Sequence, residues 1–150
     1  MNSVLRSLGL IERTIHCRSE DIANCGGEMA RQLRGRYGPI SVGVVGYQPG
    51  LVAGLAEHFG PGRVRVTDLL AENLGRRAHE VEIWDGLTRT EELIRASELV
   101  LATGSTVANN TTDPLFAVAA RHGVPVILYG VTAAAVCHLC DLPRLCLLAA

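Results

Sequence analysis

Lysine is absent from this chain of 150 residues, and all 14 basic residues are arginine. Without lysine, the chain can neither form a Schiff base nor build a phosphate loop that depends on a lysine. The arginines are scattered along the sequence, and the formal net charge is −1. Because this balance gives little electrostatic attraction for nucleic acid, we expect no nucleic-acid partner.

Long apolar runs are also absent, and none approaches the roughly 18 residues that a membrane span requires. Near the N-terminus, Arg6 and Arg13 interrupt the apolar residues and no small-residue cleavage site follows. We therefore expect a soluble, cytoplasmic protein with no membrane partner. The five cysteines are an odd number in a chain without an export signal, which predicts free thiols or metal ligands rather than a disulfide framework.

What is present indicates one compact domain over residues 1–150, because hydrophobic residues make up 48% and no linker or repeat interrupts them. Residues 1–38 predict a helical N-terminal extension, and residues 39–150 predict an α/β core. Ser19 is a candidate cap for a helix with the apolar face Ile22, Met29, Ala30 and Leu33. Gly26 and Gly27 each cost this helix about 1 kcal/mol relative to alanine, so we expect a kink or two short helices.

Short apolar runs alternate with helical patterns after Pro39. The predicted strands are 40–46, 64–66, 81–84, 99–102, 126–129 and 145–148, of which 81–84 is short or at an edge and 145–148 is a final edge strand. The predicted helices are 49–59, 71–77, 89–96 with a capping box of Thr88 and Glu91, a helix that Pro114 opens, and 132–139. The fold class is therefore α/β: a Rossmann-like, doubly wound, mostly parallel sheet of five to six strands, preceded by N-terminal helices.

Ligands of such folds bind outside the carboxyl ends of the strands, and a polar segment lies at one such end. It runs from Thr103 to Thr112, between a predicted buried strand and the next helix. Its hydroxyls, amides and backbone N–H groups suit a polar or anionic ligand group. The alternative is a capping segment, since threonine, serine and asparagine also bond their own backbone.

A second strand-to-helix turn contains Gly43, Gly46 and Pro49, and its spacing does not match a dinucleotide fingerprint. Asp68 ends the next strand, where Rossmann-type proteins place a carboxylate that binds ribose hydroxyls. The alternative for Asp68 is an exposed turn residue. Together these features permit a nucleoside-containing ligand such as S-adenosylmethionine.

Cys137 and Cys140, followed by Cys146, have a spacing that suits a thiophilic transition metal. The alternative is core packing, because the surrounding segment is apolar and cysteine is often buried. Cys17 and Cys25, with His16, could join such a site only if the N-terminal helix folds back near the chain end. No serine elbow or carboxylate pair of a hydrolase is present, which disfavours standard hydrolysis, and the sequence does not identify a catalytic residue.

Four segments occur in the order found in a known family: 42–47, Asp85-Gly86, Thr103-Gly104-Ser105-Thr106 with Asn109-Asn110-Thr111, and Tyr129-Gly130-Val131-Thr132. Over residues 40–148 the chain resembles the "putative heavy-metal chelation" family, which has a Rossmann-like domain. In its better-described members, an N-terminal domain similar to the enolase N-terminal fold forms the other wall of a cleft. Here about 38 residues precede the sheet, so the resemblance implies a missing wall or one supplied by another chain.

We expect a domain that binds a small ligand or a metal complex, for heavy-metal chelation or cofactor handling. The alternatives are a transferase that uses S-adenosylmethionine or a nucleotide, and a structural subunit, in a homo-oligomer or with another partner, that completes a cleft. The expected cofactor is a transition metal or a nucleoside-containing ligand. The predicted ligand-binding residues are Gly46, Tyr47, Asp68, Asp85, Thr103, Gly104, Ser105, Thr106, Asn110, Thr111, Gly130 and Thr132, and the predicted metal ligands are Cys137, Cys140 and Cys146.

Overall fold

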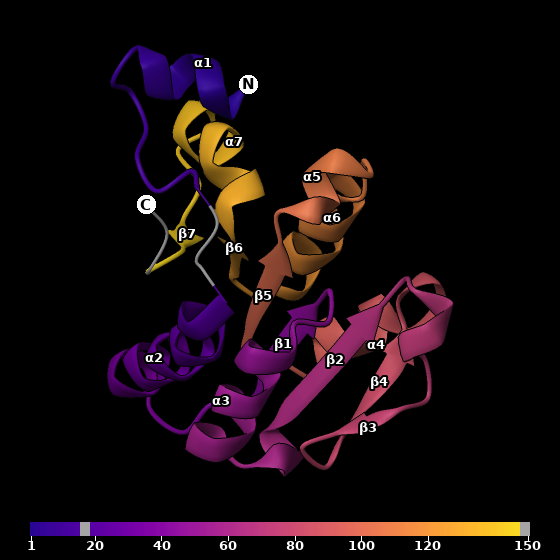
Figure 1. Ribbon diagram of the computed structural model, residues 1–150. Helices are drawn as coiled ribbons and strands as arrows, with labels where there is room; N and C mark the ends of the chain where they lie inside the picture. The colour runs from indigo at the N-terminus through magenta and orange to yellow at the C-terminus, as the bar shows by residue number, and fades with distance from the viewer. Residues whose placement is uncertain (16–18, 148–150) are drawn as a thin grey trace.

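The structure, a computed structural model, describes residues 1–15 and 19–147 (Figure 1). The predictions for His16 and Cys17, and for the side chains of Ser19 and Ile22, lie outside the described residues. None of the helices in these ranges is both long and apolar enough to cross a membrane.

A seven-stranded sheet forms the centre of the molecule, in the order β3-β4-β2-β1-β5-β6-β7 (Figure 1). Six strands are parallel: β1 (Val42–Val45), β2 (Val64–Asp68), β4 (Val81–Asp85), β5 (Leu99–Thr103), β6 (Val126–Tyr129) and β7 (Arg144–Leu145). Numbered along the chain, these six have the order 3-2-1-4-5-6, which is that of Rossmann folds. The predicted fold class is confirmed.

The seventh strand, β3 (Arg77–Ala78), is antiparallel to β4 and was not predicted. Residues 71–77 were expected to be a short helix, but only Ala71–Asn73 form a turn of 3-10 helix. His79 and Glu80 both have positive φ and form the turn that brings β3 back against β4. A two-residue strand is too short to show an alternating pattern in the sequence.

Helices cover both faces of the sheet. The helices are α1 (Asn2–Ser7), α2 (Ser19–Tyr37), α3 (Pro49–Phe59), α4 (Gly86–Arg95), α5 (Ser105–Ala108), α6 (Thr112–His122) and α7 (Ala134–Leu139). One core cluster joins α2 and α3 to the face that carries Val44 and Leu101, and another joins α4 and α6 to the face that carries Val100 and Ala102. Alternate residues of the central strands thus point into different cores, as expected for a sheet buried on both faces.

Helix α2 is one continuous helix, so the expected division into two short helices at Gly26 and Gly27 is wrong. A Cβ atom at Gly26 would overlap the backbone of Gly50 in α3, and one at Gly54 would lie 2.7 Å from the Gly26 carbonyl oxygen. Gly26 therefore lets the two helices cross at backbone contact. The packing gained there offsets the low helix propensity of glycine.

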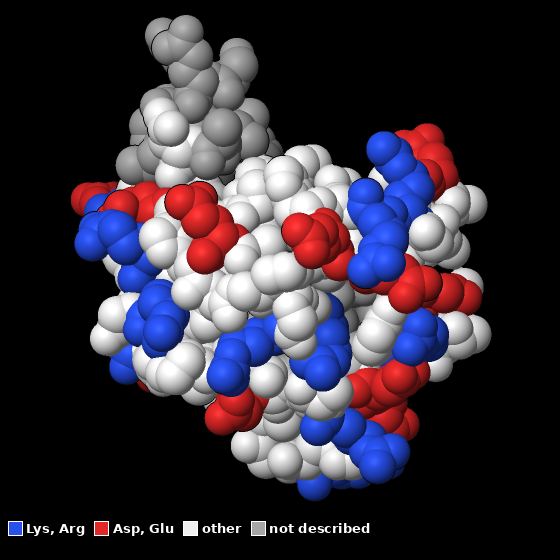
Figure 2. All heavy atoms as spheres, turned by 90° about the horizontal axis from the view of Figure 1, so that it is seen from below, with Lys and Arg blue, Asp and Glu red and all other residues white. Residues whose placement is uncertain are grey.

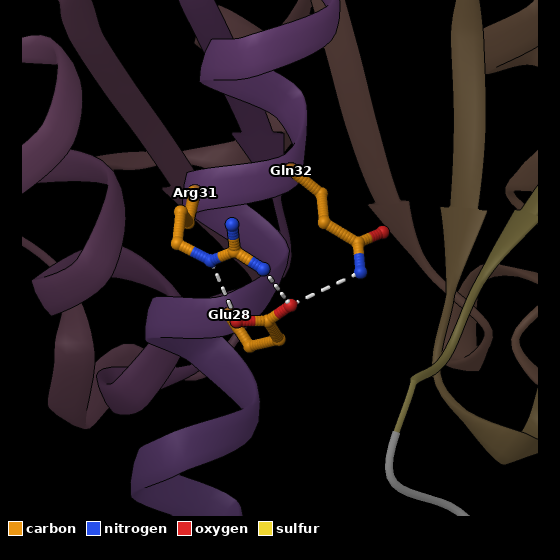
Figure 3. A network of polar contacts seen from close by, with 3 residues as sticks. All are labelled: Glu28, Arg31 and Gln32. Atoms are coloured by element: carbon orange, nitrogen blue, oxygen red, sulfur yellow. Dashed lines mark hydrogen bonds and ion pairs between the residues drawn. The ribbon is translucent and has the colours of Figure 1, made fainter.

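The outer side of α2 carries a local polar network (Figure 3). The Glu28 carboxylate accepts hydrogen bonds from Arg31 at 2.8 Å and from Gln32 at 3.1 Å. These bonds lower the pKa of Glu28 to about 2, chiefly through Arg31. A depressed acid pKa stabilises the fold above the ordinary pKa of glutamate, and this contribution is lost as the pH falls toward 2.

Charged side chains of both signs are interspersed on the face seen in Figure 2. This face is the underside of the molecule as it is oriented in Figure 1. This mixture agrees with the scattered arginines of the sequence and differs from the basic stripe that typifies nucleic-acid-binding surfaces.

Candidate ligand-binding site

The site lies at the carboxyl ends of β1 and β5, which are neighbours at the centre of the sheet. From β1 the chain continues into α3 and then to β2 on one side, whereas from β5 it continues through α5 and α6 to β6 on the other. The two connections leave along opposite faces, which defines the switch point where open α/β sheets bind ligands. Two cavities open there, one on each face.

The larger cavity has a volume of about 610 Å³, within the usual range of small-molecule sites. It lies against α4 and α6, and its apolar lining includes Val45, Leu115 and Val118. Three exposed leucines, Leu69, Leu70 and Leu87, also line it. We call it the α4/α6 cavity.

The charged side chains in the lining of the α4/α6 cavity are carboxylates. They are Asp68 and Glu91, and among the described lining residues there is no arginine. Glu91 is 53% exposed and lies 3.1 Å from His122 Nε2 of α6. That contact lowers the pKa of Glu91, so the carboxylate stays ionised to a lower pH than usual.

Asp68 fixes the turn that follows β1. Its Oδ2 accepts a hydrogen bond from the Tyr47 N–H at 2.6 Å, and its Oδ1 accepts one from the Leu70 N–H at 2.7 Å. The side chain is buried, so the alternative of an exposed turn aspartate is wrong. Asp68 also lines the cavity, and its contact with a ribose stays a prediction.

Tyr129 at the end of β6 was not among the predicted site residues. Its hydroxyl donates a hydrogen bond of 2.6 Å to the carbonyl oxygen of Gly46, across the end of β5. Burial raises the pKa of Tyr129, so the fold loses stability as the pH rises above 10, the ordinary value for tyrosine. The sequence signal was available: a tyrosine that ends a buried strand directly before Gly130.

Replacing Tyr129 by phenylalanine should lower the free energy of unfolding by about 1–3 kcal/mol, because the Gly46 carbonyl loses its partner. Urea unfolding measures this difference. Tyr37→Phe is the matched control, since the Tyr37 hydroxyl makes no hydrogen bond to any described residue. Equal effects of the two substitutions would contradict a role for the Tyr129 hydroxyl.

The segment after β5 contains a helix that the sequence did not predict. Residues 105–108 form α5, and the Thr106 hydroxyl donates to the Thr103 carbonyl oxygen at 2.8 Å. Thr112 in turn donates to Thr106 Oγ1 at 3.1 Å. The alternative that these residues bond their own segment is thus correct in part, because several of the hydroxyls stabilise its conformation. The next helix, α6, begins at Thr112 rather than at Pro114.

The structure brings ten of the twelve predicted ligand-binding residues to the two cavities. The α4/α6 cavity is lined by Gly46, Tyr47, Asp68, Thr103, Ser105, Thr106 and Thr111, and the smaller one by Thr103, Gly104, Ser105, Gly130 and Thr132. Gln48, which caps α3 through its side chain, lines both and was missed. The cavities therefore share a wall made by Gln48, Thr103, Ser105 and Tyr129.

Asp85 and Asn110 line neither cavity. The Asp85 side chain caps α4, accepting from the Leu87 N–H at 2.8 Å and from the Thr88 hydroxyl at 3.2 Å. The capping box predicted for Thr88 and Glu91 is therefore wrong, and α4 begins three residues earlier, at Gly86. Asn110 has a φ of 59° and forms the turn between α5 and α6.

The three predicted metal ligands do not form a cluster. Cys137 lies on α7 and packs into the core, where burial raises the pKa of its thiol. Cys140 is exposed. Cys146 lines the smaller cavity. Within residues 1–15 and 19–147, no three His, Cys, Asp or Glu side chains are placed to hold a metal ion together.

Fold and site together define a Rossmann-like α/β domain with two cavities at the switch point. Residues 32–143 match the family described as "Putative heavy-metal chelation". The chain belongs to this family, as its sequence motifs predicted.

The fold is similar to that of a solved structure from the same family, a protein with unknown function from Pyrococcus horikoshii. The TM-score is 0.51 at 18% identity, and the similarity covers 63% of this chain and 35% of that one. The chain thus corresponds to about a third of that protein. No curated protein sequence matches the chain.

Proposed function

We propose that this protein binds a small ligand without net negative charge, either an organic molecule or a metal complex, in the α4/α6 cavity. The observation that carries the proposal is the lining of this cavity. A space of about 610 Å³ is lined by apolar side chains and threonine hydroxyls, with two carboxylates and, among the described residues, no arginine. Lysine is absent from the whole chain, so no ammonium group is available either.

Helix N-termini are the other common source of anion-binding groups, and at α3 and α4 the first donors are already used. At α3, Pro49 has no N–H and the Leu51 N–H donates to the Gln48 side chain. At α4, the Leu87 N–H donates to Asp85. The first turn of α6 carries the carboxylate of Asp113. An anionic group, one of the ligand groups expected from the Thr103–Thr112 segment, would find little compensation in this cavity.

A second candidate function is that of a transferase that uses S-adenosylmethionine. The strand order and the position of Asp68 at the end of β2 favour a nucleoside ligand. The carboxylates and the lack of arginine in the lining favour a sulfonium cation over the phosphates of a nucleotide.

Calorimetric titration with adenosine, S-adenosylmethionine and AMP tests both candidates, because the three probes share adenine and ribose and differ in charge at the 5′ position. We expect AMP to bind at least tenfold more weakly than the other two. Val118→Phe should remove binding by filling the cavity, whereas Ala117→Phe places the same side chain on the exposed side of α6 and should have no effect.

Equal or tighter binding of AMP would contradict the charge argument. Binding that survives Val118→Phe would place the ligand elsewhere. If none of the three probes binds, the transferase candidate is rejected and the ligand is not a nucleoside.

A further inference from the structure

Three exposed leucines form one rim of the α4/α6 cavity. Leu69, Leu70 and Leu87 line the cavity and are 46%, 59% and 83% exposed. They lie close together, because a Cβ atom at Gly86, next to Leu87, would be 3.2 Å from Cδ2 of Leu69. We call these three residues the leucine rim. Leucine is usually buried, and a group of exposed leucines beside a cavity indicates a surface that a ligand or a partner covers.

The chain holds two of these leucines in place by the same turn. Asp68 and Asp85 end β2 and β4 and are direct neighbours in the parallel register. Asp68 Oδ1 accepts a hydrogen bond from the Leu70 N–H at 2.7 Å, and Asp85 Oδ1 accepts one from the Leu87 N–H at 2.8 Å. The backbone of the rim is thus fixed by the chain itself, so covering the rim requires little further ordering.

The leucine rim and the hydroxyl groups of the lining lie at different ends of the cavity. Thr103, Ser105 and Thr106 lie at or directly after the carboxyl end of β5, whereas the rim lies at the carboxyl ends of β2 and β4. In the order β4-β2-β1-β5, strands β4 and β5 are three strand spacings apart, or about 14 Å (Figure 1). Val45 of β1 lies between them and is apolar. The cavity therefore presents hydroxyls at one end and leucines at the other.

The small extent of the leucine rim fits a ligand better than a second copy of the chain. A stable protein interface takes about 800 Å² and roughly 20 residues from each partner, which three leucines do not supply. Among the described residues, the other exposed large hydrophobic side chains lie within residues 1–15 or at Leu139 of α7, so they do not extend the rim. A molecule that fills the cavity reaches the rim directly, because the leucines are part of its lining.

We propose that the ligand of the α4/α6 cavity is an amphiphile, with an uncharged polar head group bound at residues 103–106 and an alkyl or aromatic group that covers the leucine rim. This inference rests on the proposed function and adds the chemical class of the ligand. Each methylene group that becomes buried against the apolar side chains raises the affinity about fourfold.

Titration of the full-length protein with the straight-chain alcohols butanol, hexanol and octanol, followed by protein NMR, tests the proposal. We expect the affinity to rise about fourfold for each added methylene group. In a variant that combines Leu70→Ser with Leu87→Ser, this gain should fall below about twofold, and octanol should bind roughly tenfold more weakly. Both leucines are exposed, so the variant should keep its fold, which circular dichroism melting curves establish.

Leu139→Ser is the matched control, because Leu139 is also 59% exposed but lines neither cavity. It should bind the alcohols as tightly as the unchanged protein. The alkanoates of the same chain lengths separate this inference from the proposed function. Their carboxylate should weaken binding roughly tenfold at every chain length, whereas the gain for each methylene group should stay the same.

An unchanged gain for each methylene group in the variant without Leu70 and Leu87 would overturn the inference and leave the proposed function standing. Failure of octanol to bind the unchanged protein would also overturn the inference. Alkanoates that bind as tightly as the alcohols would instead contradict the proposed function. Light scattering tests the other occupant: a dimer that dissociates in this variant would overturn the inference, because a second copy would then cover the leucine rim.

Discussion

Replacing Gly26 by alanine is expected to lower the free energy of unfolding by about 3 kcal/mol, and the melting temperature by roughly 10 °C. The reason is the crossing of α2 and α3, where a Cβ atom at this position would overlap the carbonyl group of Gly50. Both groups belong to helix backbones, so neither can rotate away, and the helices have to separate. Chemical denaturation with two spectroscopic probes measures the change.

Gly27→Ala is the matched control for this prediction. A Cβ atom at Gly27 would meet nothing within 4 Å, so this substitution should stabilise the protein by up to about 1 kcal/mol through helix propensity alone. Two neighbouring glycines of one helix are thus expected to respond in opposite directions. A stabilising effect of Gly26→Ala would show that the two helices do not meet at Gly26.

The second large effect is expected at Gly46, the residue that follows β1 and lines the α4/α6 cavity. Its φ of 92° is a conformation that alanine rarely adopts, and a Cβ atom there would overlap the methyl group of Thr103. Strain and overlap together should cost Gly46→Ala about 3 kcal/mol of stability. Urea unfolding gives this value.

Two controls separate strain from overlap. Gly60 has a similar φ of 86° in open space, so Gly60→Ala should show the strain alone, about 1–2 kcal/mol. Thr103→Ser removes the overlapping methyl group and should recover about 1 kcal/mol in the Gly46→Ala background. If Gly60→Ala costs as much as Gly46→Ala, contact with Thr103 does not contribute.

The sequence was sufficient to predict the sheet because its central strands are buried on both faces. Runs such as 99–102 have no polar residue, and each is followed by a turn and a helical pattern. Because ligands of such sheets bind at the carboxyl ends of the strands, the residues at those ends could be predicted to lie together. In the structure, Thr103 and Gly46 do meet at the switch point. Family motifs supplied Gly130 and Thr132, whose positions at the smaller cavity depend on the same strand order.

Features that depend on contacts between distant segments could not be predicted. Gly26 carries no local sign that Gly50 lies against it. The hydroxyl of Tyr129 donates to the carbonyl group of Gly46, which lies 83 residues earlier, directly after β1. At α4 two residues were suitable caps, and Asp85 is used instead of Thr88 because it ends the strand from which the helix starts. The predicted cofactors, the oligomeric state and the partner chain stay predictions.

The shared wall of the two cavities has a thermodynamic consequence. Both cavities are lined by the same four residues, Gln48, Thr103, Ser105 and Tyr129. A molecule that binds in one cavity and moves these residues therefore also changes the shape of the other cavity. Linkage then requires reciprocity: occupancy of either cavity alters the affinity of the other by the same factor. The two binding equilibria would then be coupled through the four residues of the shared wall.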